Sequence, residues 1–156
     1  MRRVTLAAMA SVEDGLLAPL NELVGSWAIE AAHPAFPGTV VGGQSDFAWL
    51  EGERFLIQRS RTDHPDFPDS LIVFGEFDED GLGLGMHYFD SRGVHRVYGV
   101  SFSEGVWRMW RNAPGFSQRF TGTFNEDGDT IDGLWELSRD DATWDDDLKI
   151  SLRRNA

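Results

Sequence analysis

Short turn sequences recur along this chain and divide it into segments of about 8 to 12 residues. Glu104-Gly105 and the segments 112–115 and 126–129 are examples, rich in the glycine, proline, asparagine and aspartate that favour tight reversals. Between the turns, large apolar residues alternate with polar ones, which is typical of strands with one buried face. The turn spacing therefore predicts an all-β chain of about ten short strands.

The expected strands follow one another as a meander. The first begins at Gly25-Ser26-Trp27 and ends at His33-Pro34, because proline cannot donate to a ladder. The others cover residues 40–50, 54–61, 71–77, 82–90, 94–102, 106–111, 116–124, 130–137 and 147–153. This sequential order favours an up-and-down antiparallel barrel, in a single domain spanning residues 1–156. Residues 1–15 are expected to form a flexible arm, and the leucine spacing within 16–23 predicts a short helix or turn that caps one barrel end.

Charge and composition limit the partners of the chain. The formal net charge of −12 disfavours nucleic acid and anionic membranes, which bind basic surfaces. The chain has no cysteine, and its acidic segments 63–66 and 140–147 lack the spacing of a calcium loop, so no metal is expected. The apolar part of residues 4–10 is too short for a membrane span or a typical signal peptide. We expect a cytoplasmic monomer or homodimer.

Hairpin register predicts which residues face the barrel interior, because directly opposite residues share a face. The turn at Glu104-Gly105, taken as two residues, sets Phe102 opposite Trp107. Residues 112–115, taken as a four-residue loop, set Arg111 opposite Phe116 and Met109 opposite Gln118. The predicted inward polar residues are Arg96, Tyr98, Arg111 and Gln118, and the predicted inward aromatic residues are Trp107, Phe116, Phe120 and Trp135.

Other positions depend on less regular links. Either His87 or Tyr88 lies beside Arg96: a link of two or four residues at 90–93 selects His87, which we favour, and a bulge selects Tyr88. Trp49 is expected to face inward, and Arg59 is a further inward candidate. Towards the C-terminus the same parity sets Leu137 opposite Leu148.

Gly25-Ser26-Trp27 and Arg154 resemble the calycin pattern of lipocalins and their relatives. In that pattern a G-x-W tryptophan closes one barrel end, and an arginine from the last strand covers it by cation–π attraction. The chain also looks like an uncharacterised bacterial family of calycin-like domains, through residues 23–27, 88–93, 114–122 and 133–136. These resemblances imply a lipocalin-like barrel, with Trp27 and Arg154 as its closure, and they bring no established activity.

Two narrower resemblances concern the ligand. The chain is distantly similar to nitrobindins, calycin-like haem proteins with an axial histidine in a late strand. This chain has no histidine after His95, so haem binding would require His87 or another of the four histidines. Arg96-Val97-Tyr98 resembles the Arg-x-Tyr pair with which intracellular fatty-acid-binding proteins hold a carboxylate. That likeness implies an anion site, which Arg111 and Gln118 would complete.

Three interpretations of the interior remain. The first is a binding site for a small, largely apolar ligand with an anionic head group. In the second, the arginines only neutralise buried acids, and aromatic residues fill a scaffold without a pocket. The third is an isomerase, cyclase or hydrolase of a small hydrophobic substrate, for which the acid–base candidates are His87, Tyr88, Asp90 and Tyr98. The chain contains no G-x-S-x-G, H-E-x-x-H or P-loop motif, so the sequence identifies no catalytic residue.

Overall fold

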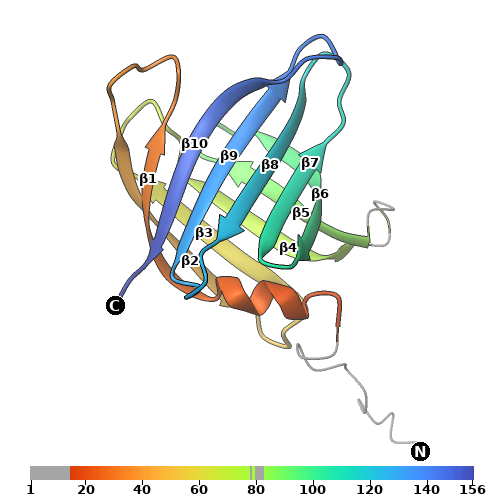
Figure 1. Ribbon diagram of the computed structural model, residues 1–156. Coiled ribbons are helices and arrows are strands. Elements are labelled where there is room, and N and C mark those ends of the chain that lie inside the picture. Colours follow the sequence, from red (N-terminus) through yellow and green to blue (C-terminus); the bar gives the residue numbers. More distant parts are fainter. Residues whose placement is uncertain (1–14, 78, 80–82) are drawn as a thin grey trace, which may run out of the picture.

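Ten antiparallel strands close into a barrel in the computed structural model, which describes residues 15–77, 79 and 83–156 (Figure 1). The strands are β1 Gly25–Ala32, β2 Val41–Trp49, β3 Leu56–Thr62, β4 Ser70–Phe77, β5 Gly83–Asp90, β6 His95–Ser103, β7 Val106–Arg111, β8 Ser117–Phe124, β9 Thr130–Ser138 and β10 Asp145–Arg154. Each strand pairs with its sequence neighbours, and β1 also pairs with β10. The all-β up-and-down barrel predicted from the turn spacing is confirmed. The expected N-terminal arm lies outside the described residues, apart from Gly15.

One end of the barrel is covered by the 3-10 helix η2, Ala18–Leu23, which lies below the strands in Figure 1. Leu20 and Leu23 of this helix are fully buried, and the carbonyl of Leu23 accepts a 2.8 Å hydrogen bond from Nε1 of Trp27. The leucine spacing thus correctly predicted a short cap. Within the described part of the chain, no helix has both the length and the apolar character needed to cross a membrane.

Arg154, on the last strand, lies over the ring of Trp27, on the first, with 4.1 Å between the guanidinium carbon and the ring centroid. The same guanidinium donates hydrogen bonds of 2.7 Å to the carbonyls of Glu22 and Val24. Gly25 has a φ of 128°, and a Cβ at this position would lie 2.9 Å from Nη1 of Arg154. The glycine of the G-x-W sequence therefore makes room for the arginine that covers the tryptophan.

Large aromatic side chains occupy the inner face of the sheet. The Trp107 ring packs against Phe47, Phe74 and Phe120, with centroid distances of 6.1, 6.0 and 4.9 Å. Phe120 in turn lies against Gly133, where an added Cβ would come within 2.6 Å of the ring. Glycine in the middle of β9 therefore serves packing, since it leaves space for a neighbouring aromatic side chain.

The β6–β7 register is as predicted, whereas the β7–β8 register differs by two residues. Arg111 lies opposite Gln118, and Met109 lies opposite Phe120. The difference arises because Phe116 donates from its backbone N–H to the carbonyl of Ala113 and stays in the loop. A shift by an even number of residues keeps the same side chains inward, so the predicted face of β8 is correct although the predicted pairs are not.

The β9–β10 register also departs from prediction. Leu137 lies opposite Asp145 rather than Leu148, because an irregularity between Asp146 and Lys149 interrupts the ladder. A bulge of this kind adds residues to one strand only, and no turn sequence announces it. Leu148 nevertheless packs against the core.

Candidate functional site

The candidate site lies in the barrel interior, towards the end opposite η2. The loops that join β1 to β2, β7 to β8 and β9 to β10 border this end in Figure 1. Consecutive strands are antiparallel, so the β3–β4 and β5–β6 loops lie at the same end. The β1–β2 and β3–β4 loops contact each other through Phe36 and Phe67, whose ring centroids are 5.7 Å apart. We call this end the mouth.

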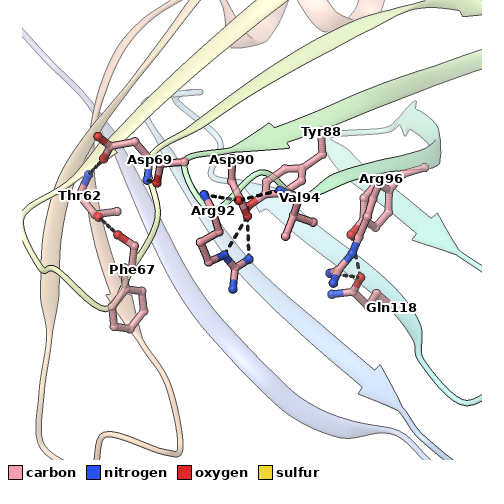
Figure 2. Close-up of polar contacts among 11 residues, drawn as sticks. Thr62, Phe67, Asp69, Tyr88, Asp90, Arg92, Val94, Arg96 and Gln118 are labelled. Atoms are coloured by element: carbon pink, nitrogen blue, oxygen red, sulfur yellow. Dashed lines mark hydrogen bonds and ion pairs between the residues drawn. The ribbon is translucent and has the colours of Figure 1, made fainter.

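Arg96, Tyr98 and Gln118 form a hydrogen-bonded cluster on the inner face. Oε1 of Gln118 accepts hydrogen bonds from the Tyr98 hydroxyl at 2.7 Å and from Nη1 of Arg96 at 3.2 Å. Tyr98 and Gln118 are buried, with exposed fractions of 3% and 8%, while Arg96 is half-buried. Figure 2 shows Arg96 and Gln118 side by side. The structure therefore brings together three of the residues that the register predicted to face inward.

Arg111 and Phe116 extend the cluster towards the mouth. Nη1 of Arg111 donates a 3.2 Å hydrogen bond to the carbonyl of Phe116. The Arg96 guanidinium carbon lies 5.0 Å from the centroid of the Phe116 ring. Phe116 is 37% exposed, so solvent reaches the place where Arg96 lies over its ring and Arg111 binds its carbonyl. The two arginines thus line one side of the mouth.

Neither Arg96 nor Arg111 has a carboxylate partner among the described residues. The ion pairs found there are His33–Asp147, His64–Asp66, Arg92–Asp90 and Arg119–Glu136. The interpretation in which both arginines neutralise buried acids is therefore not supported. Arg96 and Arg111 are thus half-buried guanidinium groups without an ion-pair partner within the described residues, in a chain whose net charge is −12.

A second polar group at the mouth consists of Tyr88, Asp90 and Arg92. Asp90 accepts hydrogen bonds from the Tyr88 hydroxyl at 2.8 Å and from Nε and Nη2 of Arg92 at 3.1 and 2.7 Å. The backbone N–H groups of Arg92 and Val94 donate to its other oxygen. In Figure 2 the side chains of Tyr88, Arg92 and Arg96 extend to the same side of the β5–β6 pair. Arg92 was missed by sequence reasoning, because a turn residue has no face that periodicity assigns.

The environment shifts the acidities of these groups in opposite directions. Burial raises the pKa of Asp90, but the hydrogen bonds from Arg92 and Tyr88 outweigh it and hold that pKa at about 2. Burial, together with the hydrogen bond to Asp90, raises the pKa of the Tyr88 phenol well above its usual value. Burial also raises the pKa of the Tyr98 phenol, against the opposing effect of the Arg96 guanidinium. Both phenols therefore remain neutral hydrogen-bond donors at physiological pH.

The preference for His87 beside Arg96 is wrong. Tyr88 lies opposite Arg96, and His87 lies opposite Val97 on the outer face. The link is an odd one, three residues long, and ends with Gly93 at a φ of 85°. On the outer face the His87 ring stacks on His95, with Nδ1 and Nε2 3.0 Å apart.

Arg59 also faces outward, contrary to its candidate role in the lumen. It is exposed and lies opposite Asp46, whereas the inward residues of β3 are Leu56, Gln58 and Ser60. The link before β3 contains two residues with positive φ, Gly52 and Glu53, which change its parity. Gln58 is therefore an interior polar residue that sequence reasoning missed. Its signal was register with the buried Phe47, which lies directly opposite it.

The predicted aromatic wall is divided between the two ends of the barrel. Trp135 contacts Tyr98 and Phe120, with ring centroids 5.6 and 5.1 Å away, so it lies beside the polar cluster. Trp49 is at the η2 end, where its Nε1 donates a 3.0 Å hydrogen bond to the side chain of Asn21. The site therefore combines a polar mouth with an apolar floor of Trp135, Phe120 and Trp107, and Trp49 lies outside it.

Three of the four histidines do not fit a haem ligand in the lumen. His87 and His95 are on the outer face, as described above. The ring of His33 uses both nitrogens, one with Asp147 at 2.6 Å and the other with the backbone N–H of Ala35 at 3.0 Å. Within residues 15–77, 79 and 83–156, three or more metal-binding side chains nowhere gather in one place.

Fold and site together define a closed antiparallel barrel with a polar cluster on its inner face. The chain matches no protein-family model and no curated protein sequence. Among solved structures it is similar to the crystal structure of Rv2717c from M. tuberculosis, with a TM-score of 0.62 and 16% sequence identity. The match covers 90% of this chain and 98% of that one. At this identity the similarity supports the barrel fold and carries no function or family across.

Proposed function

We propose that the barrel binds a small, largely apolar molecule through its lumen, with an anionic head group held at the mouth by Arg96 and Arg111. The observation that carries this proposal is the pair of half-buried guanidinium groups without a carboxylate partner among the described residues. A buried charge without a counter-charge costs several kcal/mol, so such groups are normally paired. An anionic ligand would supply the missing charge.

The hydrogen-bonding capacity of the cluster supports an anion. A guanidinium has five N–H donors, and Arg96 uses one of them on Gln118. The remaining donors suit a carboxylate, which accepts two parallel hydrogen bonds from one arginine. Tyr98 already donates to Gln118 and thereby holds the Gln118 amide in place. The carboxylate would then complete the cluster without displacing its internal hydrogen bonds.

The apolar floor supports a hydrocarbon or aromatic ligand body. Trp135 is half-buried although it faces inward, so part of its surface remains for a ligand to cover. Covering apolar surface contributes about 25 cal/mol for each Å² removed from water. A barrel of ten strands has room for about one small ligand.

The groups that an enzyme would need are poorly matched to acid–base work. His87 lies outside the barrel. Asp90 is held ionised with a pKa of about 2, and the pKa of Tyr88 is raised above its usual value. General acids and bases act best with pKa values near the working pH. This arrangement favours binding over catalysis.

Native mass spectrometry of the purified protein tests for a co-purified anionic ligand. Titration with a medium-chain fatty acid, followed by tryptophan fluorescence, then gives an affinity. We expect Arg96→Ala and Arg111→Ala each to weaken binding by about tenfold or more, the value of a lost charge-assisted hydrogen bond. Arg108→Ala is the matched control, because Arg108 is on the same strand as Arg111 but is exposed on the outer face. Equal affinities for all four proteins would contradict the proposal.

A further inference from the structure

A third polar group, in the lumen, belongs to none of the interactions described so far. It lies on β2 and β3, where Nε2 of Gln58 is 2.9 Å from Oγ of Ser45 and 3.2 Å from Oγ of Ser60. The two serine hydroxyls are themselves 2.7 Å apart. Gln58 is only 8% exposed, and its Oε1 has no hydrogen-bond partner among the described residues.

Gln58 lacks one hydrogen-bond partner whichever way its side-chain amide is oriented. Exchanging its oxygen and nitrogen would let Oε1 accept hydrogen bonds from the serine hydroxyls, since hydroxyls can donate as well as accept. The NH₂ group would then occupy the outer position without a partner. In either orientation one end of a buried amide lacks a hydrogen bond, which is unusual for a folded protein.

Trp107 provides a second buried atom of the same kind. Its Nε1 has no hydrogen-bond partner among the described residues, and the residue is 2% exposed. Both Trp107 and Gln58 adjoin Phe47: the Trp107 ring is 6.1 Å from the Phe47 ring, and Gln58 lies directly opposite Phe47 in the β2–β3 ladder. Two unsatisfied polar atoms thus belong to side chains that both neighbour one buried aromatic residue, Phe47.

The strand pairing gives the distance between Gln58 and Arg96 of the anion site. Gln58 pairs with Ile72, Ile72 with Tyr88, and Tyr88 with Arg96, so all four side chains are in one row of the inner face. Three strand spacings separate Gln58 from Arg96, which is about 14 Å along the wall. The row therefore begins with the Arg96 guanidinium at the mouth and ends with the Gln58 amide on β3, with apolar surface between them.

We propose that Gln58 and Trp107 form a second subsite that recognises a hydroxyl group on the ligand, so that the ligand is a hydroxylated apolar carboxylate rather than a simple fatty acid. A hydroxyl fits because it donates and accepts at once. It would donate to Oε1 of Gln58 and accept from Nε1 of Trp107, and it suits the amide in either orientation. This inference rests on the proposed function, since Arg96 holds the other end of the same molecule.

The test compares ω-hydroxy carboxylic acids of about 8 to 12 carbon atoms, a length that suits this span, with the unsubstituted acids of equal length. We expect the hydroxy acid to bind the wild-type protein about five- to tenfold more tightly, as one or two hydrogen bonds would provide. Gln58→Leu and Trp107→Phe should each remove most of this preference. Gln58→Leu should leave the affinity for the unsubstituted acid unchanged, since Gln58 is not part of the apolar floor. Arg96→Ala should weaken both acids equally.

The outcomes separate the two proposals. If both acids bind equally well and Arg96→Ala weakens both, the anion site stands and the second subsite is overturned. Gln58 and Trp107 would then bind only a buried water. A preference for the hydroxy acid that survives both Gln58→Leu and Trp107→Phe also overturns it. If neither acid binds, or if Arg96→Ala has no effect, the proposed function fails and the second subsite fails with it. Trp107→Phe keeps an aromatic side chain in the core, so we expect this variant to fold, and it is the folding control for Gln58→Leu.

Discussion

The Tyr98 hydroxyl donates a 2.7 Å hydrogen bond to Oε1 of Gln118, which joins β6 to β8 across the intervening strand on the inner face of the barrel. Both residues are buried, and the same oxygen accepts from Arg96. A buried acceptor that loses its donor costs more than the hydrogen bond contributes when it is made. The pair therefore couples the proposed anion site to the stability of the barrel wall.

Removing this hydrogen bond should destabilise the protein measurably. We expect Tyr98→Phe to lower the free energy of unfolding by about 1–2 kcal/mol, since Gln118 keeps only the longer bond from Arg96. Urea unfolding followed by circular dichroism measures the change. In a double-mutant cycle with Gln118→Leu, the two losses should be less than additive; strict additivity would show that the residues do not interact.

Asp90 should make the stability of the barrel depend on acidic pH. Its pKa of about 2 is below the ordinary aspartate value of 3.8, so its contribution is fully present above about pH 4 and is lost as the pH falls towards 2. We expect Asp90→Asn to cost about 1–2 kcal/mol at pH 7, a value that allows for screening because Arg92 is exposed. The gap between wild-type and variant unfolding free energies should narrow between pH 4 and pH 2. A gap that stays constant over this range would contradict the assignment.

Arg154 should be required for closure of the barrel. Arg154→Ala removes the contact with Trp27 and two hydrogen bonds, to the carbonyls of Glu22 and Val24, and we expect a loss of about 2–4 kcal/mol. Arg154→Lys should recover only part of this, because an ammonium cannot both stack and donate in a fork. Arg153→Ala, at an exposed neighbouring position, is the control and should change the thermal midpoint little.

Gly133 should tolerate no side chain while Phe120 is present. An added Cβ would lie 2.6 Å from the Phe120 ring, so we expect Gly133→Ala to destabilise the barrel by about 1–3 kcal/mol. The same substitution in a Phe120→Leu background should cost less, because the smaller side chain yields the space. Equal costs in both backgrounds, measured by thermal unfolding, would place the strain elsewhere.

The sequence was sufficient for the fold and for most of the inward face, because the side-chain period of a strand is two. Where the structure shifts a predicted register by two residues, as at Gln118, the same side chains stay inside. A link that differs from its expected length by an odd number of residues has the opposite effect. The three-residue link before β6 brings Tyr88 rather than His87 inside, and the link before β3 brings in Gln58 rather than Arg59.

Those two errors share a physical cause. Both links contain residues with positive φ, namely Gly93 in one and Gly52 with Glu53 in the other. Glycine permits such a conformation but does not require it, so its presence leaves open how many residues the reversal contains. The sequence could not predict that Gln58 and Trp107 lack hydrogen-bond partners, because this depends on how side chains from different strands are placed in three dimensions.

The contact between Trp27 and Arg154 has a consequence for how the chain folds. The nine other strand pairs join sequence neighbours and can form as each hairpin is completed, whereas the β1–β10 pair joins segments more than a hundred residues apart. Closing so long a loop carries an entropic cost that local pairing does not. We therefore expect the barrel to be completed last at this seam, and until Arg154 arrives the first strand presents an open edge to other chains.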